Sequence, residues 1–215
     1  TGTTYMDGKV SRNFMFEPNP LIWDQDFTRM KKYGINMIRT GIWMGWRQLM
    51  PEPGVIPEVY LRALDAFLLN AAKYDMPVII NLFAFLPDDW GGEHPYADKL
   101  SFAAQCEFTA IVVQRYKNLK HVIWDLINEP YFYFKDNIAG KSVVKRWSQW
   151  LHSRHGDMET LSGKWRIPFD RFDGFDSVRI PSISELEYKN EYDNRNALWA
   201  IDYNLFGQDS FNHWT

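Results

Sequence analysis

The sequence predicts an α/β fold in which parallel strands alternate with helices, namely the N-terminal half of a (β/α)8 barrel. Two observations carry this prediction. Short runs rich in Val, Ile and Leu alternate with stretches of helical periodicity, and these runs recur at even spacing. The runs that begin at Ile35, Pro77 and His121 are 42 and 44 residues apart. At about 40 residues a unit, a closed barrel of eight units needs roughly 320 residues, so the 215 residues here supply about four units.

Four segments predict strands, because each is a short apolar run bounded by turn residues. Strands of a parallel sheet are buried on both faces and therefore read as nearly continuous apolar sequence. The fourth run ends abruptly at Pro130, which has no N–H to continue a ladder. The predicted strands are residues 2–6, 35–43, 77–85 and 121–128.

Between and after these strands, apolar residues recur at helical intervals. Trp23, Phe27 and Met30 mark the first helix, and Gly34 is a suitable stop for it. The remaining helices are marked by Leu61, Leu64, Leu68 and Ala71, by Ala104, Phe108 and Ile111, and by Val143, Trp147 and Leu151, with Gly156 as the last stop.

The pattern changes after Gly156. Asp157 is suited to cap a short helix that carries Met158, Leu161 and Trp165 on one face. A stretch rich in Asp, Gly, Pro and Ser follows. We therefore expect residues 1–215 to form one partial barrel, with an inserted, loop-rich subregion at about 157–196.

Composition and charge exclude several classes of protein. The net charge is −3 and no long basic run occurs, which disfavours nucleic acid as a partner. No apolar stretch approaches the roughly 18 residues that cross a bilayer, so no membrane partner is expected. No strand is followed by a phosphate-binding glycine loop, which disfavours a nucleotide-binding fold. No metal or other cofactor is implied, and the compartment stays open between the bacterial cytoplasm and a periplasmic or secreted location.

Glu129 is the leading candidate for chemistry. It lies at the carboxyl end of the fourth predicted strand, the end at which the active sites of parallel barrels lie. A carboxylate in that place acts either as a general acid/base or as a structural anchor for a neighbouring loop. Asn128 precedes it, and since adjacent strand residues point to opposite faces, the strand end must bulge or twist for both to reach one site.

Arg39 is the second unusual residue, because it interrupts an apolar predicted strand. A guanidinium in that position needs a carboxylate partner. The pair would either serve a catalytic carboxylate at the barrel mouth or be a buried salt bridge with no catalytic role.

Aromatic residues make up 17% of the chain, and several fall at or just after strand ends. Aromatic rings stack on the apolar C–H faces of sugars, although packing beneath a loop is an equally common role. The candidates for lining a sugar site are Trp43, Trp46, Phe85, Trp90 and Tyr131.

The segment Trp124-Asp-Leu-Ile-Asn128-Glu129-Pro130 resembles the fourth strand of the retaining glycoside hydrolases of clan A, which are TIM barrels. In that clan the Glu is the acid/base, the Asn binds the sugar 2-hydroxyl, and an Arg on the second strand supports the nucleophile. The resemblance gives those roles to Glu129, Asn128 and Arg39. Residues 150–169 are most similar to family 42, the β-galactosidases, and the Asn-Glu-Pro sequence is more typical of family 5.

The resemblance implies a hydrolase of β-galactosides or related β-linked sugars that uses two carboxylates in a double displacement. It implies an oligo- or polysaccharide substrate and is consistent with a homo-oligomer. The clan places its nucleophile on the seventh strand, so we expect that residue outside these 215 residues and do not assign it to Glu185, Glu187 or Glu191. The alternatives are a non-catalytic carbohydrate-binding barrel, an endo-acting glucanase or mannanase, and a half barrel that pairs with another chain.

Overall fold

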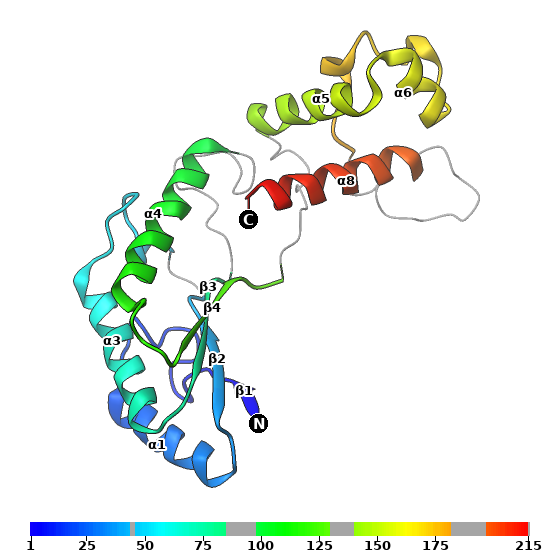
Figure 1. Cartoon of the computed structure of the whole chain (residues 1–215). Helices are drawn as coiled ribbons and strands as arrows, with labels where there is room; N and C mark the ends of the chain where they lie inside the picture. Colours follow the sequence, from blue (N-terminus) through cyan, green and yellow to red (C-terminus); the bar gives the residue numbers. More distant parts are fainter. Residues whose placement is uncertain (44–45, 85–97, 130–139, 182–196, 215) are drawn as a thin grey trace. The chain divides into compact units, whose positions relative to one another are not determined.

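The computed structural model describes residues 1–43, 46–84, 98–129, 140–181 and 197–214. The chain divides into two compact units, each of which is described by itself (Figure 1). The first, called here the sheet unit, comprises Thr1–Pro87 and Ala104–Pro130. The second, called the helical unit, comprises Asp88–Ala103 and Tyr131–Thr215.

Four parallel strands form the centre of the sheet unit, in the order β1-β2-β3-β4. The predicted strands and their parallel pairing are therefore confirmed, with slightly shorter bounds. Consecutive strands lie side by side because each returns through a crossover segment, as right-handed βα units do. The strands are β1 Gly2–Thr4, β2 Met37–Gly41, β3 Val78–Phe83 and β4 Val122–Ile127.

The crossover segments contain the predicted helices. Asn19 caps the first of them by accepting the N–H of Ile22, and Pro20 takes the first turn, where a missing N–H costs nothing. Gly34 follows its end with φ +76°, as the sequence predicts. The helices are α1 Pro20–Lys32, α2 Trp46–Leu49, α3 Glu58–Lys73 and α4 Lys99–Tyr116; the single turn α2 was not predicted.

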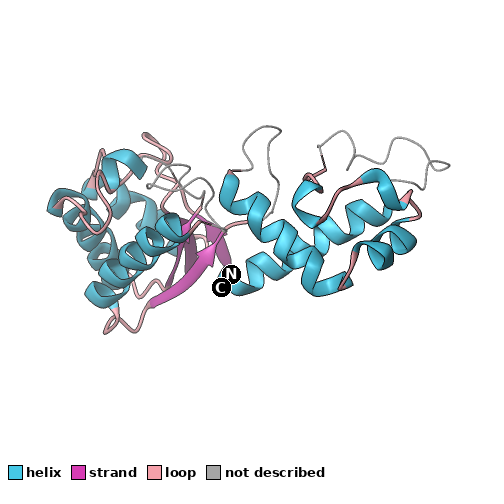
Figure 2. Cartoon of the chain, turned by 90° about the horizontal axis from the view of Figure 1, so that it is seen from above, coloured by secondary structure: helices cyan, strands magenta, loops and turns pink. Residues whose placement is uncertain are grey.

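Helices α1, α3 and α4 lie on one face of the sheet (Figures 1 and 2). Phe67 of α3 is the centre of this layer: it is fully buried and its ring lies 5.3 Å from that of Trp23 and 5.6 Å from that of Phe27. On the strands, Ile38 and Ile80 are buried as well. Burial of such side chains contributes about 1.5–3 kcal/mol each, so this packing fixes the orientation of the sheet relative to its helices.

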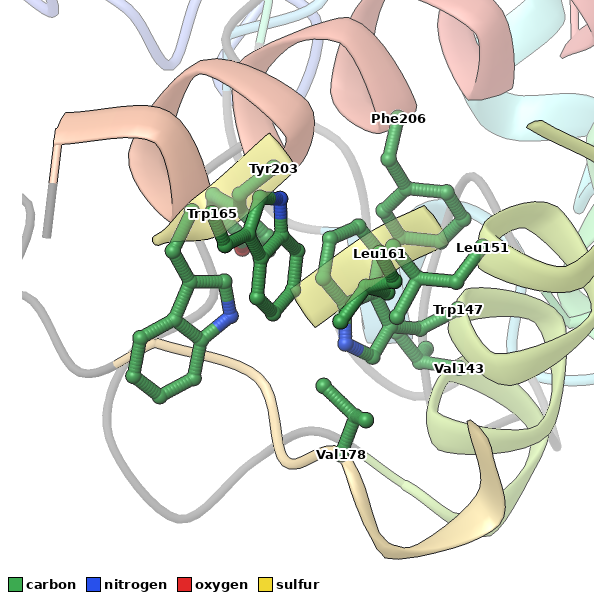
Figure 3. Packing of buried hydrophobic residues seen from close by; sticks show 9 residues of the cluster. Val143, Trp147, Leu151, Leu161, Trp165, Val178, Tyr203 and Phe206 are labelled. Atoms are coloured by element: carbon green, nitrogen blue, oxygen red, sulfur yellow. The ribbon is translucent and has the colours of Figure 1, made fainter. Parts of the chain in front are cut away.

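The helical unit is built on α5 Lys141–His155, α6 Met158–Trp165 and α8 Ala197–Trp214, with two short 3₁₀ turns at Phe169–Arg171 and Phe175–Ser177. Gly156 ends α5 with φ +80°, and Asp157 caps α6 by accepting the N–H of Thr160, so both sequence predictions are confirmed. Figure 3 shows the core of this unit around Trp147, whose ring lies 5.2 Å from that of Phe206.

A single carboxylate ties the three helices of this unit together. Asp202 on α8 is almost fully buried and accepts hydrogen bonds from Arg154 Nε at 2.9 Å, His155 Nε2 at 2.7 Å and Trp165 Nε1 at 2.7 Å. Burial lowers the pKa of His155, although the neighbouring Asp202 opposes that shift. Because a carboxylate can only accept, His155 donates from Nε2, and the lowered pKa favours the neutral form of its ring.

Candidate active site

The strand register places two charged residues on one face of the sheet. Arg39 on β2 pairs with Ile79 on β3, and Gly41 pairs with Asn81, which in turn pairs with Asp125 on β4. Because alternate residues of a strand share a face, Arg39 and Asp125 project from the same side. This face differs from the one that carries the buried Ile38 and Ile80.

Arg39 and Asp125 form an ion pair across β3. Arg39 Nε lies 3.0 Å and Nη2 lies 2.6 Å from Asp125 Oδ2, and each side chain is 30% exposed. Two donors of one guanidinium on one carboxylate oxygen fix the position of the side chain as well as neutralising its charge. The sequence prediction that Arg39 needs a carboxylate partner is confirmed.

Asn128 joins this pair. Its side-chain oxygen accepts a hydrogen bond from Arg39 Nη2 at 3.0 Å, and its backbone N–H donates to the carbonyl of Phe83 at 3.1 Å. The second bond extends the β3–β4 ladder by one step beyond β4. Asn128 therefore lies beside Arg39 at the carboxyl end of the sheet.

Glu129 follows at the point where the chain leaves the strand. Its φ is +46°, in the left-handed region that non-glycine residues adopt at a cost of about 1–3 kcal/mol, so the backbone turns here as the sequence argument requires. Its side chain is exposed and, within the part of the chain that the structure describes, no hydrogen bond or ion pair is formed by it.

The five aromatic candidates fall into two groups. Trp43 follows β2 and is 6% exposed, with the Arg12 guanidinium 5.9 Å from its ring centroid. Trp46 begins α2, although its side chain is not described. The other three lie outside the described residues: Phe85, Trp90 and Tyr131. A sugar-stacking role for these residues stays a prediction.

Two polar residues on this face were missed by sequence reasoning. Asp125 lies inside an apolar run, and an acid in that context was a signal that could have matched it to Arg39. Asn81 lies between Gly41 and Asp125, is fully buried, and finds no hydrogen-bond partner for either amide atom among the described residues. A Cβ on Gly41 would lie 2.9 Å from the Cβ of Asn81, so the two strands approach closely at this point.

A hollow of about 280 Å³ lies beside Arg39, and Gly2, Met37 and Ile79 are among the residues that line it. Within the described ranges, no group of three or more His, Cys, Asp or Glu side chains is arranged to hold a metal ion. Nor does any helix in those ranges have the length and apolar content to cross a membrane.

Comparison with protein families gives two matches. Residues 5–153 match the model of the cellulases, glycosyl hydrolase family 5, and residues 92–215 match that of the family 42 β-galactosidases. Each match covers more than half of the chain. The chain belongs to the glycoside hydrolases of clan A. Both family models include β4, Asn128 and Glu129 of this chain, and the predicted resemblance to both families is confirmed.

Solved structures show the same fold. The β-galactosidase of the psychrophilic Marinomonas ef1 is 16% identical, with a TM-score of 0.65 over 99% of this chain and 33% of the β-galactosidase. An exo-β-1,4-mannosidase, Op5Man5 from Opitutaceae bacterium strain TAV5, is 14% identical, with a TM-score of 0.54 over 75% of this chain and 29% of that one.

A GH5_18 protein from Streptomyces cattleya, solved with GlcNAc, is 13% identical, with a TM-score of 0.54 over 67% of this chain and 39% of that one. These identities show the fold alone: the chain is part of a (β/α)8 barrel and spans about a third of the length of the solved structures that it matches. No curated protein matches the sequence.

Proposed function

We propose that the complete protein is a retaining β-glycoside hydrolase in which Glu129 is the general acid/base. The observation that carries this proposal is the hydrogen bond from Arg39 to Asn128, directly beside Glu129 at the carboxyl end of β4. Arg39, Asn128 and Glu129 in this arrangement supply a positive charge, an amide and a carboxyl group at one edge of the sheet. Active sites of parallel barrels lie at that edge.

The proposed reaction uses two carboxylates about 5–5.5 Å apart. Glu129 protonates the oxygen of the leaving group while a second carboxylate, on a part of the barrel outside these residues, attacks the anomeric carbon. In the second step Glu129 removes a proton from water, and the resulting hydroxide releases the sugar from the glycosyl-enzyme. The anomeric configuration is retained because it is inverted twice.

We propose β-galactosides or related β-linked sugars as substrates. Support for galactosides comes from the family 42 match over residues 92–215. The family 5 match over residues 5–153 supports endo-acting glucanase or mannanase activity as the alternative. Aryl β-galactoside, β-glucoside and β-mannoside substrates distinguish these classes directly.

The test is turnover by the full-length protein and its Glu129→Gln variant. General acid–base catalysis contributes about 10²–10⁴-fold, so we expect a loss of that size on substrates with poor leaving groups. Substrates with activated aryl leaving groups need no proton, and their first step should be affected far less. Glu17→Gln, at an exposed glutamate of the sheet unit, is the control and should keep full activity.

The stereochemistry of the first product gives a second readout. Retention predicts that the β-anomer appears first in a proton NMR time course, before mutarotation. If Glu129→Gln retains full activity on an unactivated glycoside, the assignment of the acid/base is wrong. Sugar binding without turnover by the wild-type protein would instead identify a carbohydrate-binding barrel.

A further inference from the structure

Asp125 is a residue to which neither the family resemblance nor the proposed mechanism gives a role. It nevertheless makes a two-donor contact in the candidate site, because Nε and Nη2 of Arg39 converge on its Oδ2 at 3.0 and 2.6 Å. The two residues come from β2 and β4, which are separated by β3. Neither side chain can shift without breaking these bonds.

Arginine has five N–H donors in a rigid, planar fork and no acceptor. Asp125 takes the Nε donor and one Nη2 donor, and Asn128 takes the other Nη2 donor. One edge of the guanidinium is therefore fully used. The two Nη1 donors make no hydrogen bond to a described residue, and they are the ones left for a further carboxylate.

The same contact decides which way the Asn128 amide faces. Because Arg39 can only donate, the amide must present its oxygen to Nη2, which leaves its NH₂ group to donate elsewhere. The bond from the backbone N–H of Asn128 to the carbonyl of Phe83 fixes the backbone that carries this side chain. Asn128 is thus set as a hydrogen-bond donor before any substrate arrives.

We propose that Asp125 is a positioning residue that acts through Arg39 to hold the Asn128 amide as a donor toward a hydroxyl oxygen of the substrate sugar. The inference rests on the proposed function, since it assumes a sugar beside Asn128 and Glu129. It adds a series of three hydrogen-bonded residues, Asp125, Arg39 and Asn128, of which only Asn128 touches substrate. It also gives Asp125 a second effect, because its charge offsets that of Arg39 beside the two catalytic carboxylates.

The test is a double-mutant cycle in the full-length protein with Asp125→Asn and Asn128→Ala. A displacement of about 1 Å in a positioned group costs on the order of 10²-fold in rate, so each single variant should lose about that much in kcat/KM. If Asp125 acts through Asn128, the double variant should lose little more than Asn128→Ala alone. Losses that multiply would overturn the proposal.

The pH profile separates positioning from a merely structural role. Asp125→Asn leaves the Arg39 charge uncompensated, and a positive charge favours ionised carboxylates. The basic limb of the kcat/KM profile, which reports loss of the proton from the acid/base, should therefore move to lower pH. An unmoved limb would contradict the electrostatic part of the proposal.

Asp65→Asn is the matched control, because Asp65 on α3 holds Arg115 on α4 through two bonds of 2.9 and 2.5 Å at a similar exposure. It should leave kcat/KM and the pH profile unchanged.

If Asp125→Asn does not fold, Asp125→Glu keeps the charge and should keep the pH profile while losing kcat/KM. Full activity in that variant would also overturn the proposal. Loss of activity in Glu129→Gln with wild-type activity in Asp125→Asn would leave the proposed function intact and remove this inference alone.

Discussion

At the scale of single residues, Asn81 is the least satisfied polar group near the candidate site. It is fully buried, and neither its amide oxygen nor its nitrogen has a hydrogen-bond partner among the described residues. A buried polar group without a partner costs about 1–3 kcal/mol. Proteins tolerate such costs mainly where a function requires the group, and Asn81 lies level with Asp125 on the same face.

We therefore expect Asn81→Leu, an apolar side chain of similar shape, to raise the free energy of unfolding by about 1 kcal/mol. Urea denaturation followed by tryptophan fluorescence measures the change. Asn70→Leu is the matched control, because Asn70 Nδ2 donates to the carbonyl of Pro20 at 3.0 Å and should lose stability on substitution. A marked loss of stability in Asn81→Leu would mean that the amide has a partner in the complete protein.

At the scale of elements, most of the architecture follows from local patterns. The apolar patterns predict the principal helices and the strands β2, β3 and β4, because each of these elements is long enough to repeat its signal. The turn α2 was missed because four residues do not repeat any period. The helix stops at Gly34 and Gly156 and the helix cap at Asp157 were predicted correctly. The type of residue at such a position largely decides whether a helix can begin or end there.

The contacts that join elements were harder to predict. Arg39 and Asp125 are 86 positions apart, and only the strand register brings them together. The sequence shows that Arg39 needs a carboxylate but not which one supplies it. Asp202 likewise collects donors from 37 to 48 positions away, and no local pattern marks it as the centre of a unit.

The two glycines of the α5–α6 region give a prediction at this scale, because one has a special backbone conformation and the other does not. Gly156 has φ +80°, which L side chains rarely adopt, so Gly156→Ala should lose about 1–2 kcal/mol. Gly163 lies inside α6, and a Cβ there would meet nothing within 4 Å. Gly163→Ala should gain about 0.5–1 kcal/mol, because glycine is a poor residue inside a helix.

Thermal denaturation of the two variants beside the wild type tests this pair. The expected shifts in melting temperature have opposite signs. A stabilising Gly156→Ala would show that the left-handed end of α5 is not maintained in solution. A destabilising Gly163→Ala would show that the surface of α6 is covered in the complete protein.

At the scale of the whole molecule, the two units depend on different kinds of interaction. The sheet unit is organised by aromatic packing around Phe67, and the hydrogen bond from Arg39 to Asn128 lies at the carboxyl edge of its sheet. The helical unit instead has a buried polar centre, in which Asp202 binds groups of α5 and α6. Because the two units have separate cores, a change in conditions that destabilises one unit should leave the stability of the other unchanged.

Mild acid is such a change, because His155 is buried in the helical unit. Its folded pKa lies below the ordinary value of 6.5, since burial disfavours the charged ring more than Asp202 on α8 favours it; Arg154 on α5 and Lys164 on α6 add to the lowering. As the pH falls below about 6.5, the unfolded state binds the proton first. The stability contributed by neutral His155 is therefore complete above that pH and is lost progressively toward the folded pKa.

We expect acidification from pH 7.5 to 5.5 to raise hydrogen exchange in α5, α6 and α8 but not in α1 and α3, after correction for the pH dependence of exchange in unstructured peptides. Mass spectrometry of the full-length protein resolves these segments. His155→Gln keeps a donor to Asp202 without a titrating ring, so this variant should lose the pH effect. Equal acceleration in both units, or an effect that persists in His155→Gln, would show that another group controls the response. An acid response confined to α5, α6 and α8 would show that the buried polar centre sets the stability of the helical unit independently of the sheet that carries Glu129.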